Sequence, residues 1–251
     1  MLNPRQLADY QKQGYLLVEG LIPDQVSRKA MDKLWSILEM RPDQSESWKN
    51  VPKLANVQSY RNLIDITTTD ADLLACCTPE FMQASSQLTD DPSVSTHYPN
   101  GINTINVFPS EKWWCGKAHI DGIELGGKKH RRSLPGPLRM VVLTFLSDTK
   151  SKGGGTMVWP QSHHKIRALA ESDSEKYHYL TDLHNDVPSL NLGDSIELQP
   201  KRGDVLFFQH MFAHAGTANI SQIPRFAFRY LCTCRSCKRW THSAEWNLWT
   251  P

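Results

Sequence analysis

The sequence lacks the features that would place it in a membrane, in a secretory pathway or on nucleic acid. No apolar run approaches the roughly 20 residues of a membrane span, and residues 1–15 lack the charged-then-apolar pattern of a signal peptide. The formal net charge is only +2, from 28 basic and 26 acidic side chains, which is too small to indicate a nucleic-acid or membrane partner. We therefore expect a cytoplasmic protein.

Disulfide bonds and internal repeats are not indicated either. In a cytoplasmic chain of 251 residues, we expect the six cysteines to be reduced thiols and not a disulfide framework. Three of them, Cys232, Cys234 and Cys237, resemble half of a zinc site, but a structural zinc usually needs four ligands, so structural thiols are the preferred interpretation. With no repeat and no linker, residues 1–251 are interpreted as a single domain.

The order of apolar segments predicts a mainly β protein with flanking α-helices. Helical spacing indicates helices over residues 4–13 and 24–38, with mixed signals and short helices up to residue 95. The second half has short strands separated by Gly, Pro and Asp turns, expected at residues 102–108, 138–146, 156–159, 196–200, 205–208 and 226–232. This pattern favours a barrel or double-sheet jelly roll over residues 96–240, with residues 1–95 as an N-terminal helical layer.

A candidate metal motif lies at His119-Ile120-Asp121. On a strand, residues two apart point to the same face, so both side chains can reach one ion. The third ligand must come from elsewhere: His214 is preferred, and His210, four residues earlier, is its rival. Two histidines and one carboxylate leave coordination positions open, as non-haem Fe(II) oxygenases require.

Arg225 supports the choice of His214. It lies 11 residues further on, so two antiparallel strands joined by a turn would return it to the metal. A guanidinium there can hold a carboxylate through two parallel hydrogen bonds. The distal carboxylate of 2-oxoglutarate needs such a fixed cation.

Four ordered segments resemble the phytanoyl-CoA dioxygenase-like family of Fe(II)/2-oxoglutarate oxygenases. They are the opening residues 7–18, the metal motif 119–121, the segment 153–163 (GGGTMVWPQSH), and residues 203–216 followed by Arg225. The resemblance implies a double-stranded β-helix with Fe(II) in its mouth, bound by His119, Asp121 and His214. It also implies oxidation of a substrate C–H bond with 2-oxoglutarate and O₂, which yields succinate and CO₂.

The family's other cosubstrate contacts transfer to this sequence less directly. Its strand before the metal motif often supplies a polar contact, for which Thr104 or Asn106 is the candidate. Gly216 stands where some members carry a serine that holds 2-oxoglutarate, so that hydroxyl is missing here. Asp121 occupies the position that related halogenases replace by a small residue, which favours hydroxylation, desaturation or ring formation over halogenation.

Other residues leave alternatives open. The basic cluster Lys128–Arg132 follows the metal motif inside a Gly-rich loop and could attract an anionic small-molecule substrate. Of Trp113 and Trp114, one is expected to line the pocket and the other to pack in the core. His97, His130, His163 and His164 have no support as ligands, and the last two are expected in a loop. Two other functions remain: a non-catalytic or sensor relative, and a cupin-type metalloenzyme that does not use 2-oxoglutarate. The oligomeric state is not indicated.

Overall fold

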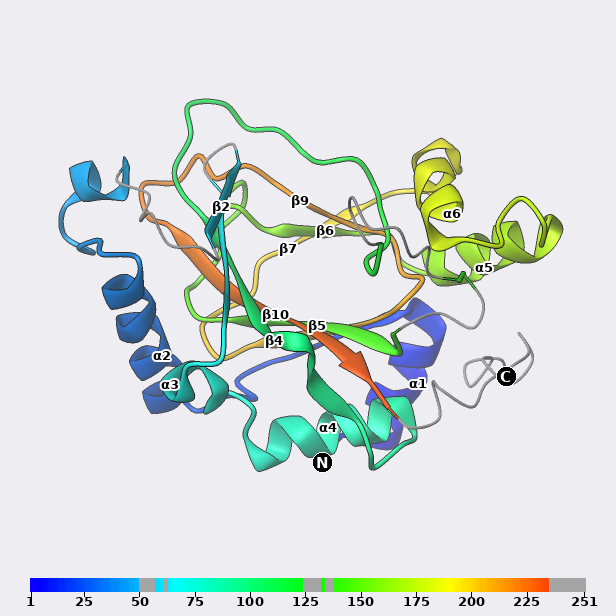
Figure 1. Ribbon diagram of the computed structural model, residues 1–251, viewed down its shortest axis with the longest axis horizontal. Coiled ribbons are helices and arrows are strands. Elements are labelled where there is room, and N and C mark those ends of the chain that lie inside the picture. Colours follow the sequence, from blue (N-terminus) through cyan, green and yellow to red (C-terminus); the bar gives the residue numbers. More distant parts are fainter. Residues whose placement is uncertain (50–56, 61–62, 124–131, 134–137, 235–251) are drawn as a thin grey trace.

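The computed structural model describes residues 1–49, 57–60, 63–123, 132–133 and 138–234 (Figure 1). Its helices are α1 (Pro4–Gln13), α2 (Asp24–Ile37), α3 (Ala71–Leu74), α4 (Pro79–Thr89), α5 (Ser162–Ser172) and α6 (Leu180–Asp186), with 3-10 turns η1 (Ser45–Lys49) and η2 (Val187–Ser189). Its strands are β1 (Tyr15–Val18), β2 (Val57–Tyr60), β3 (Leu63–Thr68), β4 (Ser95–Val107), β5 (Met140–Phe145), β6 (Thr156–Val158), β7 (Ile196–Leu198), β8 (Val205–Gln209), β9 (His214–Gly216) and β10 (Arg225–Thr233). Among the described helices, none is long and apolar enough to cross a membrane.

The strands form two antiparallel sheets that face each other. The larger has the order β1-β8-β5-β10-β4-β3-β2 and the smaller the order β7-β6-β9. Single bridges at Cys115 and His119 add the segment 115–119 alongside β9. Apolar side chains of β5, β8 and β10 meet Val158 of β6 between the sheets. This is the expected double-stranded β-helix, or jelly roll.

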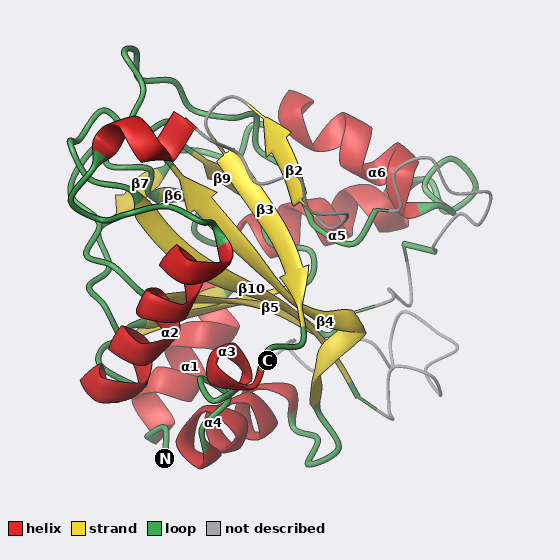
Figure 2. Ribbon diagram, turned by 60° about the vertical axis from the view of Figure 1, so that its left-hand side comes forward, coloured by secondary structure: helices red, strands yellow, loops and turns green. Residues whose placement is uncertain are grey.

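Helices cover the outer face of the larger sheet (Figure 2). Helices α1, α2 and α4 bury apolar residues against side chains of β5, β8 and β10 that point away from the smaller sheet. Trp35 of α2, for example, meets the ring of Phe226 edge-on, with centroids 4.7 Å apart. Because strand residues alternate between faces, one face of β10 packs on helices while the other faces the interior of the jelly roll.

Two regions differ from the sequence-based expectation. Part of the mixed region 41–95 forms β2 and β3, which extend the larger sheet, so residues 1–95 contribute strands as well as helices. In the strand-rich half, α5 and α6 form a separate helical pair (Figure 1). His163 and His164 therefore lie in α5 and not in a loop. These helices pack around a second apolar cluster that includes Ile120 and Met211.

Candidate metal centre

The backbone pairs His119 directly with His214. Each residue donates its N–H to the other's carbonyl, with N···O distances of 3.0 and 3.1 Å. Residues that exchange both bonds in an antiparallel pair project their side chains to the same face, and the two imidazole centroids lie 4.5 Å apart. Strand pairing thus places residues 95 positions apart in the sequence side by side.

Asp121 completes a group of three metal-binding side chains. One ligand atom from each of His119, Asp121 and His214 lies within 4.8 Å of the others, and Asp121 Oδ2 is 3.6 Å from His214 Nε2. Oδ2 is buried and accepts no hydrogen bond from any residue that the structure describes. A buried carboxylate oxygen without a partner is costly, and a divalent ion would remove that cost. The residues present therefore fit a metal.

Hydrogen bonds fix the tautomers of both imidazoles. His119 Nδ1 lies 3.0 Å from the Lys117 carbonyl, and His214 Nδ1 lies 3.2 Å from the Phe212 carbonyl. A carbonyl can only accept, so each Nδ1 carries the proton and each Nε2 keeps its lone pair. In metal-bound histidines, the ring nitrogen that does not bind the metal typically donates such a hydrogen bond.

The charges in the group also suit a metal. Burial alone would raise the pKa of Asp121, but the nearby Arg229 charge and the His214 and His119 imidazoles hold it well below its usual range. Burial, together with the neighbouring His214, lowers the pKa of His119 to about 4. The carboxylate is thus ionised and the His119 imidazole neutral at neutral pH, which are the forms that bind metals.

The rival ligand His210 lies outside this group. The expectation that positions 210 and 214 share a face assumed one continuous strand, but β8 ends at Gln209 and a turn precedes β9. His210 is buried next to Gly122, where a Cβ would lie 3.2 Å from His210 Cε1. The turn therefore removes the strand periodicity on which the ambiguity depended.

Arg225, the first residue of β10, is held rigidly inside the jelly roll. It is 3% exposed. Its Nε donates to the Gly154 carbonyl at 2.7 Å and its Nη1 to the Ile105 carbonyl at 2.8 Å. Burial lowers its pKa to about 10, so it remains a cation at neutral pH. Among the described residues, no carboxylate lies close enough to Arg225 to form an ion pair with it.

One cavity of about 190 Å³ contains both Arg225 and the metal group. Its other walls come mainly from apolar and hydroxyl side chains, which are Ile105, Val107, Trp114, Leu143, Thr156 and Thr217. A buried cation that meets no anion among the described residues is stabilised by an anionic ligand. The cavity therefore fits a small acid that binds metal at one end and a guanidinium at the other, as 2-oxoglutarate does.

Thr104 and Asn106 are not brought to this cavity. Their neighbours Ile105 and Val107 line it, so by strand alternation Thr104 and Asn106 point to the helical side of β4. There Asn106 Nδ2 donates to Thr104 Oγ1 at 2.8 Å, and both residues are fully buried. Their placement gives no support to the expected cosubstrate contact.

Several residues at the cavity were not singled out from the sequence. Thr156 and Thr217 place hydroxyl groups on the wall near Gly216, although Thr217 Oγ1 already donates to the Gly155 carbonyl at 3.1 Å. Trp114 is the tryptophan that lines the cavity. Trp113 does not pack in the core but is 38% exposed.

A second cavity, of about 220 Å³, adjoins the metal group from another side. It shares His119, Asp121 and Arg229 with the first cavity, and its remaining walls are Ile120, Gly122, Ile123, His184 and Leu231. His184 Nδ1 lies 2.9 Å from the Ile120 carbonyl, between the two metal-motif residues. The metal group therefore stands between two spaces, as a centre that binds a cosubstrate and a substrate requires.

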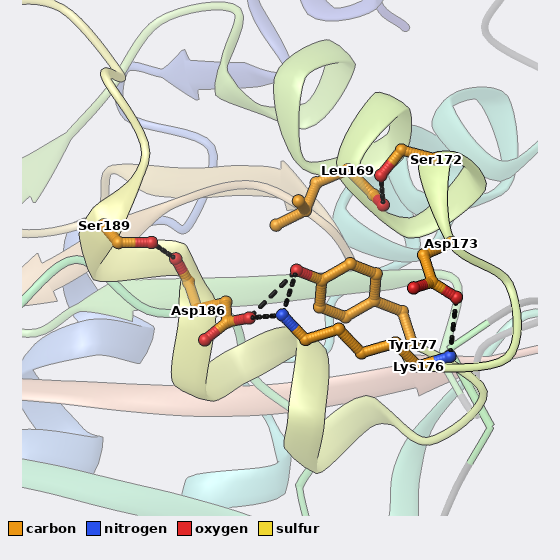
Figure 3. A network of polar contacts seen from close by, with 7 residues as sticks. All are labelled: Leu169, Ser172, Asp173, Lys176, Tyr177, Asp186 and Ser189. Atoms are coloured by element: carbon orange, nitrogen blue, oxygen red, sulfur yellow. Dashed lines mark hydrogen bonds and ion pairs between the residues drawn. The ribbon is translucent and has the colours of Figure 1, made fainter.

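A polar network braces the helix that supplies His184 (Figure 3). Asp186, at the end of α6, accepts from Lys176 Nζ at 2.7 Å and from the Tyr177 hydroxyl at 2.9 Å. Its carbonyl also accepts from Ser189 Oγ at 2.6 Å. These contacts tie the α5–α6 connection to the end of α6. They favour a fixed position of His184 on the cavity wall.

The basic loop and the C-terminal cysteine cluster lie partly outside the described residues. Residues 128–131 of the basic loop lie outside the described residues, and Arg132 is exposed. Cys237 also lies outside them, while Cys232 and Cys234 are buried. Among the described residues, the only group of metal-binding side chains is the one at His119, Asp121 and His214.

Comparisons with known proteins agree with this geometry. A family model described as phytanoyl-CoA dioxygenase (PhyH) matches residues 10–227. The fold resembles a solved non-heme alpha ketoglutarate dependent carbocyclase, SnoK from nogalamycin biosynthesis, at 18% identity and TM-score 0.63, over 92% of this chain and 83% of that one. EctD from S. alaskensis, solved with 2-oxoglutarate and 5-hydroxyectoine, matches at 15% identity and TM-score 0.59, over 93% and 76%.

A third similar structure carries a metal. The epimerase SnoN, solved in complex with Fe³⁺, alpha ketoglutarate and nogalamycin RO, matches at 12% identity and TM-score 0.63, over 92% of this chain and 83% of that one. No curated protein sequence matches this chain. Since the family model spans most of the chain and the His-Asp-His group is in place, the protein belongs to the phytanoyl-CoA dioxygenase (PhyH) family of non-haem Fe(II)/2-oxoglutarate-dependent enzymes.

Proposed function

We propose that the protein oxidises a C–H bond of a small molecule, with 2-oxoglutarate as cosubstrate and release of succinate and CO₂. In this proposal His119, Asp121 and His214 hold Fe(II), and Arg225 holds the distal carboxylate of 2-oxoglutarate. The observation that carries it is the shared cavity, in which the metal group and a buried arginine with no carboxylate partner among the described residues line the same space.

The chain's own residues position and shield the reactants in this proposal. Bound iron supplies the O₂ chemistry. Arg225 is preoriented by two main-chain carbonyls, so it would bind a carboxylate with little further ordering. Val107 and Leu143 form apolar walls beside the cosubstrate, which would exclude water and strengthen the electrostatic contacts.

The second cavity supports a small-molecule substrate. Its volume of about 220 Å³ suits a compact molecule bound beside the metal. The neighbouring structures were solved with small molecules such as nogalamycin RO and 5-hydroxyectoine. The carboxylate at Asp121 favours hydroxylation or a related oxidation, because no position is opened at the metal for a halide.

Succinate formation tests this proposal. Purified protein with Fe(II), O₂ and 2-oxoglutarate should form succinate slowly alone and faster with pooled metabolite extracts. Asp121→Ala should abolish both rates, whereas Arg5→Gln, on an exposed side chain of α1, should change neither. Metal-dependent oxidation that persists in Arg225→Ala without added 2-oxoglutarate would instead support a cupin-type enzyme. Absence of succinate under all conditions would favour a non-catalytic relative.

A further inference from the structure

Arg229 stands at the junction of the two cavities. It follows Arg225 by four residues on β10, so both side chains point into the jelly roll. Its Nη1 lies 3.6 Å from Asp121 Oδ1, while Asp121 Oδ2 lies 3.6 Å from His214 Nε2. Arg229 also lines both the cavity that contains Arg225 and the second cavity.

The guanidinium of Arg229 retains unused donors. Among the described residues, its only ion pair is the long contact with Asp121, and its buried Nε has no hydrogen-bond partner there. The side chain is 28% exposed, although the surrounding strand residues are largely buried. A cation in this position with donors unpaired is unfavourable in the free protein, and an oxyanion in the adjacent cavity would relieve it.

The charge balance of the site with Fe(II) and 2-oxoglutarate bound also favours an anionic ligand. With both groups bound, two positive charges from Fe(II) and one from each of Arg225 and Arg229 would face three negative charges, one from Asp121 and two from 2-oxoglutarate; the three side chains line the same cavity. The His119 and His214 imidazoles add none when they bind metal through Nε2. One positive charge remains in a largely enclosed site, and a single monoanionic group would balance it.

We propose that Arg229 is a specificity-determining residue that binds a carboxylate of the substrate in the second cavity, beside the metal. The inference rests on the proposed function and names the substrate class, a small acid with an apolar body. The remaining walls of that cavity, Ile120, Ile123 and Leu231, would contact the apolar part. Asp121 would keep Arg229 oriented toward the metal edge.

Pairs of acids and amides of equal shape test this inference. The probes are acetate, benzoate and phenylacetate, each with its amide, added anaerobically to protein saturated with Fe(II) and 2-oxoglutarate. Binding is followed by the visible charge-transfer absorption of the Fe(II)–keto acid chelate and by calorimetry. We expect at least one acid to bind about tenfold or more tightly than its amide and to shift the band without bleaching it.

Variants assign that preference to Arg229. Arg229→Gln should remove the preference for acids, while Arg5→Gln, which removes an exposed positive charge, should retain it. Because Arg229 contacts the metal ligand Asp121, its replacement also alters the surroundings of that ligand. A second pair of variants therefore changes Leu231 instead. Leu231→Glu places a competing carboxylate on the wall of the second cavity and should abolish the preference for acids. The neutral Leu231→Gln alters the same wall without adding charge, so it should weaken acid and amide alike and keep the preference.

The outcomes separate this inference from the function on which it rests. If the band forms but the wild-type protein binds amides as tightly as acids, the carboxylate assignment is overturned and the proposed function stands. The same holds if Arg229→Gln and Leu231→Glu both keep the preference. If no band forms with 2-oxoglutarate, the cosubstrate assignment fails, and this inference fails with it.

Discussion

At the scale of single residues, two buried histidines four positions apart have different surroundings. His214 Nε2 faces Asp121, while His210 lies behind Gly122 and outside the metal group. We predict that His214→Ala loses stoichiometric Fe(II) binding, because one of three ligands is removed. His210→Gln should still bind one Fe(II) per chain. Anaerobic metal analysis after gel filtration measures both, and loss of iron only in the His210 variant would reverse the assignment.

Residues at the site were predictable from sequence to different degrees. The two-residue spacing of His119 and Asp121 predicted that both reach one ion, although His119 forms only a single bridge and Asp121 lies in a bend. Arg225 returned to the cavity as its separation from His214 suggested. Thr104 and Asn106 lie on the helical face of β4 and not on the cavity face, and sequence alternation alone does not say which face is inside. No sequence pattern indicated a role for Arg229, because that role depends on its contact with Asp121.

At the scale of elements, the end of α1 is fixed by a glycine against α5. Gly14 has φ +83°, and a Cβ there would lie 2.3 Å from His163 Nδ1 and 2.7 Å from Phe212. Gly14→Ala should therefore destabilise the protein by more than the backbone cost of roughly 1 kcal/mol. Gly193 also has φ +83° but has nothing within 4 Å of its Cβ position, so Gly193→Ala is a matched control.

Urea unfolding of the two variants isolates the steric term. Both substitutions carry the same backbone penalty, so the difference between them reports the clash of α1 with α5. We expect Gly14→Ala to lose about 1–3 kcal/mol more than Gly193→Ala, the range for overpacked interiors. Equal losses would mean that α5 is free to move away from α1.

Elements were predictable where their residues carry strong periodicity. The first helix matches residues 4–13 because the Asn3–Gln6 capping box and Gly14 mark its ends. The fully buried β5 was visible as a near-continuous apolar run. In contrast, α5 was missed because its polar sequence SHHKIRALAES has few apolar positions. Strands β2 and β3 were missed because they are short and depend on pairing in the sheet: β3 pairs with β4, and β2 pairs with β3.

At the scale of the whole molecule, two buried histidines make stability depend on pH. Burial is the main cause that lowers the pKa of both His119 and His163 to about 4. The unfolded chain therefore binds more protons than the folded one between about pH 6.5 and 4. The free energy of unfolding of the metal-free protein should decrease as pH falls through this window, by on the order of 3 kcal/mol per histidine.

Chemical denaturation of metal-free protein at several pH values checks this dependence. His163→Gln keeps a donor for the Gln11 carbonyl, which His163 Nε2 contacts at 3.1 Å, and removes one titrating group. Its stability should therefore decline less steeply between pH 6.5 and 4 than that of the wild-type protein. Parallel curves would show that His163 is not protonated more easily on unfolding.

The central claim is that Arg225 and the metal group bind one 2-oxoglutarate between them. It is tested most directly by anaerobic calorimetric titration of 2-oxoglutarate into Fe(II)-loaded protein, with Arg225→Gln and Arg5→Gln compared. We predict one binding site per chain, unchanged in Arg5→Gln and weakened at least roughly thirtyfold in Arg225→Gln, because truncating a buried charge pair costs about 2–5 kcal/mol. Equal affinity of the wild-type protein and a folded Arg225→Gln variant would contradict the claim.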